Sequence, residues 1–266
     1  MTPLPRRPVG NTGNDVSLLG LGTVKWGRNQ QVKYPAFALP DDATLHRLLD
    51  VAEEGGVNLL DTAPAYGTAE ERLGRILRER PDSRFVIATK TGEEFRDGQS
   101  HFHYSAAHTE ASIHRSLRRL GVLTLDLVMV HCGPDDVRIL TETPVLETLR
   151  RLQEQGLVQS IGVSTMTVPG GLLAVDLADV LMVPYSIGYR EQRSVIDKAM
   201  LRNKGVFIKR ALYSGPQAGQ HLPLADLLRA VLEVPGVTSL IAGTINPDHL
   251  RENISTIATL TGSANS

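Results

Sequence analysis

The chain has 266 residues, of which 41% are hydrophobic, and a formal net charge of −1. This length suits one α/β barrel or two small domains, and the balanced charge excludes the basic footprint of a nucleic-acid-binding protein. A single cysteine, Cys132, excludes an internal disulfide framework and fits a reducing compartment. Because no apolar run approaches membrane-spanning length and the proline-rich start is not typical of a signal peptide, the sequence predicts a cytoplasmic protein without membrane contacts.

The first quarter of the chain predicts a hairpin, two strands and two helices. Turn residues within 9–18 indicate the hairpin, and residues 18–22 form a first core strand. After a long loop over 23–40, a helix with periodic leucines follows Asp41. Residues 57–61 then form a short buried strand that ends at Asp61, and Tyr66 lies in the next loop. Thr68 and Glu71 have the spacing of a capping box, which predicts the start of the second helix.

The remaining chain continues the alternation of strands and helices. Apolar runs predict strands at 85–90, 125–130, 158–163, 180–183, 205–208 and 237–242. Each is followed by a helical pattern, and a second long loop lies at 91–104. Pairs repeating about every 30 residues indicate right-handed βαβ units and a parallel sheet. Eight such units close most naturally into a (β/α)8 TIM barrel, so we expect a single domain over residues 1–266.

Three consecutive predicted strands end in groups that exchange protons. Asp61, Lys90 and His131 occupy these strand ends, and Tyr66 follows Asp61 by five residues. The segment around Asp61, taken alone, is explained equally well as a plain strand–helix joint with a surface tyrosine. All carboxyl ends of barrel strands open on one rim, where barrel enzymes place their active sites. The three strand ends together therefore indicate an active site more strongly than any one of them.

These residue types suit proton transfer beside a charged group. A tyrosine has an ordinary pKa of about 10. A neighbouring ammonium favours the phenolate and makes the phenol a better donor, and a carboxylate keeps that ammonium charged. A histidine orients a carbonyl or relays a proton. Such a site delivers a proton to a carbonyl oxygen, and a cofactor must supply the hydride or the electrons.

The chain resembles the aldo-keto reductase superfamily over nearly its whole length, in both the order and the spacing of its motifs. The motifs are Asp61-Thr62-Ala63-x-x-Tyr66-Gly67, Thr89-Lys90, Val130-His131, Gly162-Val163-Ser164 and Gly243-Thr244-x-x-Pro247-x-His249-Leu250-x-Glu252-Asn253. The resemblance implies a barrel closed at its bottom by the N-terminal hairpin, with a catalytic tetrad of Asp61, Tyr66, Lys90 and His131. It also implies hydride transfer from NADPH to an aldehyde or ketone, with Tyr66 as the acid. Since the chain ends soon after the last predicted helix, we expect an open pocket without the long C-terminal loop of many relatives.

The resemblance also implies the cofactor contacts. Ser164 corresponds to the serine that holds the nicotinamide carboxamide, and Glu252 and Asn253 to the residues that contact adenine. The chain departs from the family pattern at Thr165, Met182 and Lys209, where asparagine, glutamine and a stacking aromatic residue are usual. The complete expected set is Gly22, Thr23, Lys25, Ser164, Thr165, Met182, Lys209, Arg210, Leu212, Ser214, Gly243, Thr244, Asn246, His249, Glu252 and Asn253.

The nicotinamide coenzyme is expected to be NADPH, with NADH possible, because Gly243 and His249 make a weak grip for the 2′-phosphate. The alkyl stem of Lys209 is expected to cover the nicotinamide ring in place of the aromatic residue. We expect the partner to be a small carbonyl substrate and the chain to be a monomer or a weak homo-oligomer.

Trp26 and Phe95 lie in the two long loops, and we expect them to line the substrate pocket, with plain packing as the alternative. His101 and His103 lack a third ligand nearby in the sequence, so no metal site is expected. Cys132 follows His131, but adjacent strand residues face opposite sides, which disfavours a nucleophilic Cys–His pair.

Two other functions remain open at this point. A barrel with a strand-end lysine also suits a Schiff-base aldolase, with Lys90 as the nucleophile. A lysine held charged by Asp61 is a poor nucleophile, which disfavours this alternative. The changes at Thr165, Met182 and Lys209 are compatible with a nicotinamide-binding regulatory module that has little turnover, whereas the complete tetrad favours an enzyme.

Overall fold

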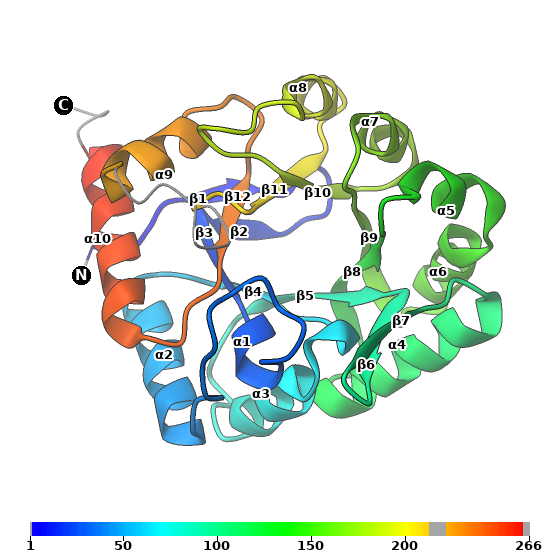
Figure 1. Cartoon of the computed structure of the whole chain (residues 1–266), viewed down its shortest axis with the longest axis horizontal. Coiled ribbons are helices and arrows are strands. Elements are labelled where there is room, and N and C mark those ends of the chain that lie inside the picture. The colour runs from blue at the N-terminus through cyan, green and yellow to red at the C-terminus, as the bar shows by residue number, and fades with distance from the viewer. Residues whose placement is uncertain (1, 213–221, 263–266) are drawn as a thin grey trace.

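The computed structural model describes residues 2–212 and 222–262. Within these ranges eight parallel strands close into a barrel and follow one another around it in chain order (Figure 1). The barrel strands are β3 (Leu19–Gly22), β4 (Leu59–Asp61), β5 (Val86–Thr91), β8 (Leu125–His131), β9 (Val158–Ser164), β10 (Val180–Pro184), β11 (Gly205–Lys209) and β12 (Ser239–Ala242). The (β/α)8 fold predicted from the sequence is therefore confirmed.

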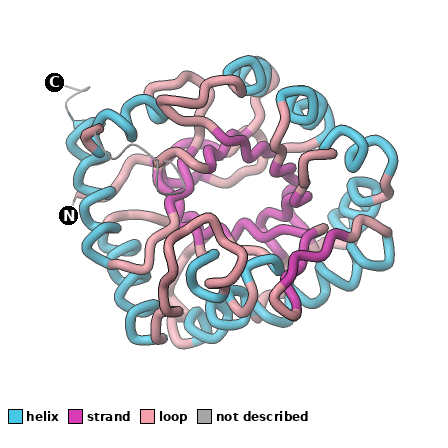
Figure 2. Tube along the Cα trace, in the orientation of Figure 1, coloured by secondary structure: helices cyan, strands magenta, loops and turns pink. Residues whose placement is uncertain are grey.

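Helices surround the barrel as an outer ring, as Figure 2 shows. Those that follow the barrel strands are α2 (Asp42–Glu54), α3 (Ala69–Arg78), α4 (Ala106–Leu120), α6 (Val145–Glu154), α7 (Val168–Leu177), α8 (Arg193–Leu201), α9 (Leu224–Leu232) and α10 (Pro247–Gly262). Their sequences place apolar residues at helical spacing. In α3, for example, Leu73 and Ile76 are buried while Glu71 and Arg75 are exposed, so one stripe of each such helix packs on the strands. None of the helices in the described ranges combines the length and the apolar character needed to cross a bilayer.

The barrel interior is apolar at its lower end and is sealed there by the N-terminal hairpin. Strands β1 (Arg6–Pro8) and β2 (Asp15–Ser17) pair antiparallel. Val9 and Val16 of this hairpin belong to the same buried cluster as Met129 and Phe207 of the barrel. A Cβ atom placed on Gly205, the first residue of β11, would lie 2.5 Å from Val9. The hairpin thus covers the amino ends of the strands, as expected, and leaves their carboxyl ends open.

The connections at the carboxyl ends contain more structure than the sequence indicated. The loop over 91–104 holds a second hairpin, β6 (Glu93–Arg96) and β7 (Gln99–Phe102), and the loop over 23–40 begins with α1 (Val24–Gly27). A short helix η1 (Pro64–Tyr66) follows β4, and an additional helix α5 (Asp136–Glu142) precedes α6. The capping box expected at Thr68 does not form. Thr68 makes no side-chain cap hydrogen bond, because its backbone lies near ψ 7° instead of in the extended region where a capping side chain reaches the helix.

Candidate active site

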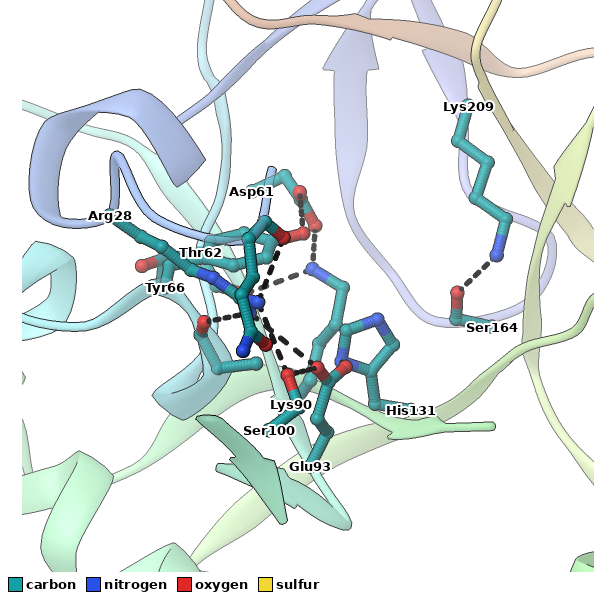
Figure 3. A network of polar contacts seen from close by, with 12 residues as sticks. Arg28, Asp61, Thr62, Tyr66, Lys90, Glu93, Ser100, His131, Ser164 and Lys209 are labelled. Carbon is teal, nitrogen blue, oxygen red and sulfur yellow. Dashed lines mark hydrogen bonds and ion pairs between the residues drawn. The ribbon is translucent and has the colours of Figure 1, made fainter. Parts of the chain in front are cut away.

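The three strand ends singled out by the sequence meet in one cavity of about 690 Å³ at the carboxyl rim of the barrel. Asp61 ends β4, Lys90 is the penultimate residue of β5, and His131 ends β8. Tyr66, the last residue of η1, turns its side chain toward the same space (Figure 3). Because β4, β5 and β8 are parallel neighbours, their register brings these side chains side by side.

Asp61 connects the tyrosine and the lysine. The Tyr66 hydroxyl donates a hydrogen bond to Asp61 Oδ2 over 3.2 Å, and Lys90 Nζ forms an ion pair with the other carboxylate oxygen. Lys90 also donates to the carbonyl oxygen of Thr62 over 2.9 Å, and its Nζ lies 4.7 Å from the centroid of the Tyr66 ring. Both charged side chains are buried. A buried ion pair needs such additional hydrogen bonds to offset its desolvation, and this pair has them.

The pKa of Tyr66 differs from the sequence-based expectation. Burial, followed by the negative charge of Asp61, raises the pKa of Tyr66 well above its ordinary value. The sequence-based argument considered only the Lys90 ammonium, and in the folded protein burial and the Asp61 carboxylate outweigh it. The phenol stays protonated, which keeps it available as a donor.

His131 has an acidic partner that the sequence reasoning missed. Its Nδ1 lies 3.0 Å from Oε2 of Glu93, the first residue of β6. Its ring also meets the Tyr66 ring edge-on, with centroids 6.4 Å apart. Burial lowers the pKa of His131, and Glu93 opposes that shift. The only clue to this contact in the sequence is Gly92, a glycine shortly after the strand-end lysine. In the structure Gly92 has a φ of +106°, and this turn brings Glu93 back over the rim.

Arg28 was also missed, and it joins three segments of the rim. Its guanidinium donates to the carbonyl oxygen of Ala65 over 3.0 Å and to Ser100 Oγ over 3.2 Å. The same group lies 3.6 Å from Glu93 Oε1 and 3.9 Å from the centroid of the Phe95 ring. Arg28 thereby holds the hairpin β6–β7 against the loop that carries Tyr66.

The two side chains expected to line the substrate pocket lie elsewhere. Trp26 is fully buried in the main hydrophobic core, and Phe95 stacks with Arg28; neither borders the cavity. The expectation that they line the substrate pocket is therefore wrong. The ring of Phe95 covers the Arg28 guanidinium, and the ring of Trp26 fills the core beside α3. Residues of the loop over 23–40 that do border the cavity are Val24, Lys25, Arg28, Gln31, Val32, Lys33 and Tyr34.

The opposite side of the cavity carries a half-buried amine, that of Lys209, without a carboxylate contact among the described residues. Lys209 Nζ donates to Ser164 Oγ over 2.9 Å, from β11 to β9 (Figure 3). Burial, with a smaller contribution from the neighbouring positive charge of Arg210, lowers the pKa of Lys209 to about 7. Beside this pair, β3 and β12 lead to Gly22 and Gly243. Both glycines border the cavity, where a Cβ atom on Gly22 would lie 3.1 Å from the Ile241 side chain and 3.6 Å from Gly243 Cα.

Most of the residues expected to contact the cofactor border the same cavity. They are Gly22, Lys25, Ser164, Met182, Lys209, Arg210, Leu212, Gly243, Thr244, His249, Glu252 and Asn253. Thr23 and Thr165 are fully buried below its surface, and the Thr23 hydroxyl donates to the carbonyl oxygen of Asp61 over 3.0 Å. Asn246 instead accepts a hydrogen bond from the Asp248 N–H at the start of α10, over 2.9 Å. Ser214 lies outside the described residues.

This half of the cavity fits a dinucleotide by its own chemistry. Two adjoining glycines at its border let a flat ring approach the backbone closely. The first turn of α10 borders the cavity, and the N–H groups at the start of a helix suit a phosphate. Lys25, Lys209 and Arg210 face the same space with basic side chains.

The fold and the site define a (β/α)8-barrel protein with an ion-paired Asp–Tyr–Lys–His cluster at its carboxyl rim. The Aldo/keto reductase family model matches residues 18–206, so the chain belongs to that family. A solved Pseudomonas aeruginosa structure assigned to the aldo-keto reductases is 44% identical, with 97% of both chains covered and a TM-score of 0.88.

Curated relatives resemble the chain over shorter stretches. Aldo-keto reductase YhdN of Bacillus subtilis is 29% identical over 198 residues, which are 71% of this chain and 56% of YhdN. D-arabinose 1-dehydrogenase of Saccharomyces cerevisiae is 35% identical over 132 residues, which are 47% of this chain and 37% of that enzyme. The chain thus spans from about a third to just over half of the length of these two relatives.

Proposed function

We propose that the protein is an oxidoreductase that reduces a small aldehyde or ketone to an alcohol, with NADPH as the coenzyme and Tyr66 as the general acid. The observation that carries this proposal is a protonated Tyr66 hydroxyl held between Asp61 and the open cavity, beside the Lys90 ammonium. Family membership and relatives named as a reductase and a sugar dehydrogenase support it. We further propose that it works in the cytoplasm.

Proton delivery follows from the contacts of Tyr66. When a carbonyl oxygen gains negative charge near the phenol, the hydroxyl turns from Asp61 and donates its proton to that oxygen. The tyrosinate left behind is stabilised by Lys90, whose Nζ lies 4.7 Å from the ring centroid. Asp61 keeps Lys90 charged and in place throughout. A nicotinamide coenzyme, when bound, would supply the hydride.

Coenzyme binding would use the opposite half of the cavity. Ser164, Arg210, Glu252 and Asn253 border it and would hold the carboxamide, the pyrophosphate and the adenine. We propose only a modest preference for NADPH over NADH, because the positions that often grip the 2′-phosphate in the family are Gly243 and His249 here. The ion pair of Lys90 with Asp61 disfavours the aldolase alternative, because a lysine held charged is a poor nucleophile.

Replacing Tyr66 by phenylalanine tests the proposal. Tyr66→Phe keeps the ring and removes only the hydroxyl, so we expect the rate of the chemical step to fall by about 10²–10⁴-fold, the usual contribution of a general acid. Binding of NADPH and NADH, measured by fluorescence titration, should stay nearly unchanged. Single-turnover reduction of an aromatic aldehyde at saturating coenzyme separates the two effects.

A matched control and two outcomes decide the result. Tyr189→Phe removes a phenol hydroxyl outside the cavity and should reduce the aldehyde at the wild-type rate. If Tyr66→Phe works within a few fold of wild type, the proton comes from another group, and His131 is the first to examine. If the wild-type protein binds both coenzymes but reduces no aldehyde or ketone, the regulatory-module alternative is correct.

A further inference from the structure

Lys209, the last residue of β11, borders the cavity on the side opposite Tyr66 (Figure 3). Its Nζ donates a hydrogen bond to Ser164 Oγ over 2.9 Å, and no carboxylate of the described residues forms an ion pair with it. The side chain is half-buried, so the amine is partly desolvated and can still be reached from the cavity. An ammonium ion in this place has neither full hydration nor a counter-ion, which favours the neutral amine.

The charged and titratable groups around Lys209 support the same conclusion. Burial, followed by the positive charge of Arg210, lowers the pKa of Lys209 to about 7. Lys90 on β5 also disfavours the ammonium, whereas Asp61 on β4 and Cys132, next to β8, favour it. The imidazole of His131 on β8 faces Lys209 as well, and each of the two groups disfavours a positive charge on the other. About half of the Lys209 side chains therefore carry a free amine at pH 7.

Two other lysines of the cavity have partners that favour the ammonium form. Lys90 is almost completely buried, but it forms an ion pair with Asp61. Burial lowers the pKa of Lys25 as well, yet its Nζ lies 4.3 Å from the centroid of the Tyr34 ring, where the π-electrons stabilise a cation. Lys209 has only the serine hydroxyl. It therefore differs from Lys90 and Lys25 in the partner of its amine, although all three border one cavity.

A free amine on the wall of a cavity is a nucleophile for carbonyl compounds. The nitrogen attacks the carbonyl carbon of an aldehyde and forms a carbinolamine, which loses water to give an imine. Both hydrogens of the amine leave with the carbonyl oxygen as water, so the step needs no oxidant and no reductant. The Ser164 hydroxyl accepts a hydrogen bond from the amine and has a proton of its own to donate, which suits it to pass a proton from nitrogen to oxygen.

We propose that Lys209 is a covalent site for aldehydes: in the coenzyme-free protein its amine, which lacks a counter-ion, forms an imine with an aldehyde that enters the cavity. This inference goes beyond the proposed reductase function and does not depend on it. It also differs from the aldolase alternative, in which the nucleophile is Lys90. Because Lys209 and Ser164 border the half of the cavity that is proposed to bind the coenzyme, the imine and the coenzyme exclude each other.

Trapping with benzaldehyde and cyanoborohydride tests the proposal on the wild-type protein. Cyanoborohydride reduces an imine to a stable secondary amine, and peptide mass spectrometry then locates it among the six lysines of the chain. At pH 7 we expect Lys209 to be modified about 10- to 100-fold faster than any other lysine, because an ordinary lysine has very little free amine at that pH. The ratio should fall as the pH approaches 10, where ordinary lysines also lose their protons. Equal modification of Lys25 or Lys90 at pH 7 would overturn the proposal.

A pair of matched variants tests whether the missing counter-ion is the cause. Ser164→Asp puts a carboxylate where the hydroxyl accepts the hydrogen bond from Lys209, and Ser164→Asn has the same size without the charge. Both variants lack the hydroxyl, so their difference isolates the effect of the charge. We expect Lys209 to be modified at least about tenfold more slowly in Ser164→Asp than in Ser164→Asn at pH 7, since a neighbouring carboxylate keeps the amine protonated. Equal rates in the two variants would contradict the proposal.

Competition with oxidised coenzyme separates this proposal from the proposed function. NADP⁺ carries no hydride to reduce the aldehyde, and at concentrations that saturate the protein in a fluorescence titration it should protect Lys209 from modification. Undiminished modification would overturn the mutual exclusion of imine and coenzyme. Selective modification of Lys209 in a protein that reduces no aldehyde would support the imine and overturn the proposed function. Reductase activity without selective modification of Lys209 would overturn the imine alone.

Discussion

The two halves of the rim differ in how their charged side chains are paired. On the half formed by β4, β5 and β8, charged side chains pair with one another: Lys90 with Asp61, and Glu93 with both His131 and Arg28. On the half formed by β9 to β12 and β3, a half-buried lysine bonds to a serine hydroxyl, and two adjoining glycines border the cavity. Figure 3 shows the two groups separated across the cavity.

The first half has its charges paired without a ligand, whereas the second half does not. Paired charges in the first half are already oriented, which is what proton transfer needs because no reorganisation remains at the moment of reaction. The second half has basic groups, Lys25, Lys209 and Arg210, in excess over nearby carboxylates. A polyanionic ligand would neutralise them. We therefore expect substitutions in the first half to slow the reaction and to destabilise the protein, and those in the second half to weaken coenzyme affinity without destabilising it.

The largest effect is expected from breaking the ion pair of the first half. Lys90→Met should lower the rate of chemistry by at least about 10²-fold through the loss of support for Tyr66. It should also destabilise the protein by about 3–5 kcal/mol, because it leaves the buried Asp61 carboxylate without its counter-charge. Single-turnover kinetics and urea unfolding measure the two quantities.

A double variant separates these two consequences. Lys90→Met combined with Asp61→Asn removes both charges, and we expect it to recover part of the stability but none of the rate. If Lys90→Met reduces aldehydes normally while borohydride traps an imine on wild-type Lys90, the aldolase interpretation is correct and the comparison between the two halves fails.

A smaller effect is expected from the second half. Ser164→Ala removes a hydroxyl that borders the cavity and bonds to Lys209. We expect the Kd for NADPH to rise by about tenfold, the equivalent of one hydrogen bond, while the single-turnover rate at saturation stays near wild type. Ser160→Ala, on the same strand but outside the cavity, serves as control. A rate loss without an affinity loss would contradict the division of the rim.

The smallest effect concerns the stability of the coenzyme-free protein. The pKa of Lys209 is about 7 when folded, against an ordinary 10.5, so between these values the unfolded chain binds a proton that the folded chain does not. Wild-type stability therefore rises with pH across this window, and the cost of burying the ammonium is fully present below pH 7.

Lys209→Met removes that cost, so we expect the Tm to rise by about 2–4 °C at pH 6 and the gain to shrink as the pH approaches 10. Thermal denaturation from pH 6 to 10 without nucleotide measures it, and the control is Lys198→Met, at a half-exposed lysine on the outer helix α8 that pairs with Asp176. A lower Tm for Lys209→Met at pH 6 would show that the ammonium is stabilised when folded.

The sequence alone determined the barrel and the strand-end positions of Asp61, Lys90 and His131. Apolar runs, helical periodicities and turn residues are local properties, and in a parallel barrel the end of every strand lies on the same rim. Once the strands are assigned, no further information is needed to bring these residues to one cavity. The alternation of side chains along a strand also predicted that Cys132 does not face the cavity with His131. Cys132 is buried, and burial raises the pKa of its thiol to about 12.

Only the tertiary structure decided how the rim loops meet. Arg28 and Ser100 are 72 positions apart and bond to each other, and no local pattern in either loop announces that contact. The same packing hides Trp26 in the core, turns Phe95 against Arg28 and brings Glu93 to His131. Burial and the carboxylate of Asp61, not the charge of Lys90, set the pKa of Tyr66. Side-chain orientation in loops and the desolvation of each ionisable group depend on neighbours distant in the chain, and these neighbours exist only when the barrel has closed.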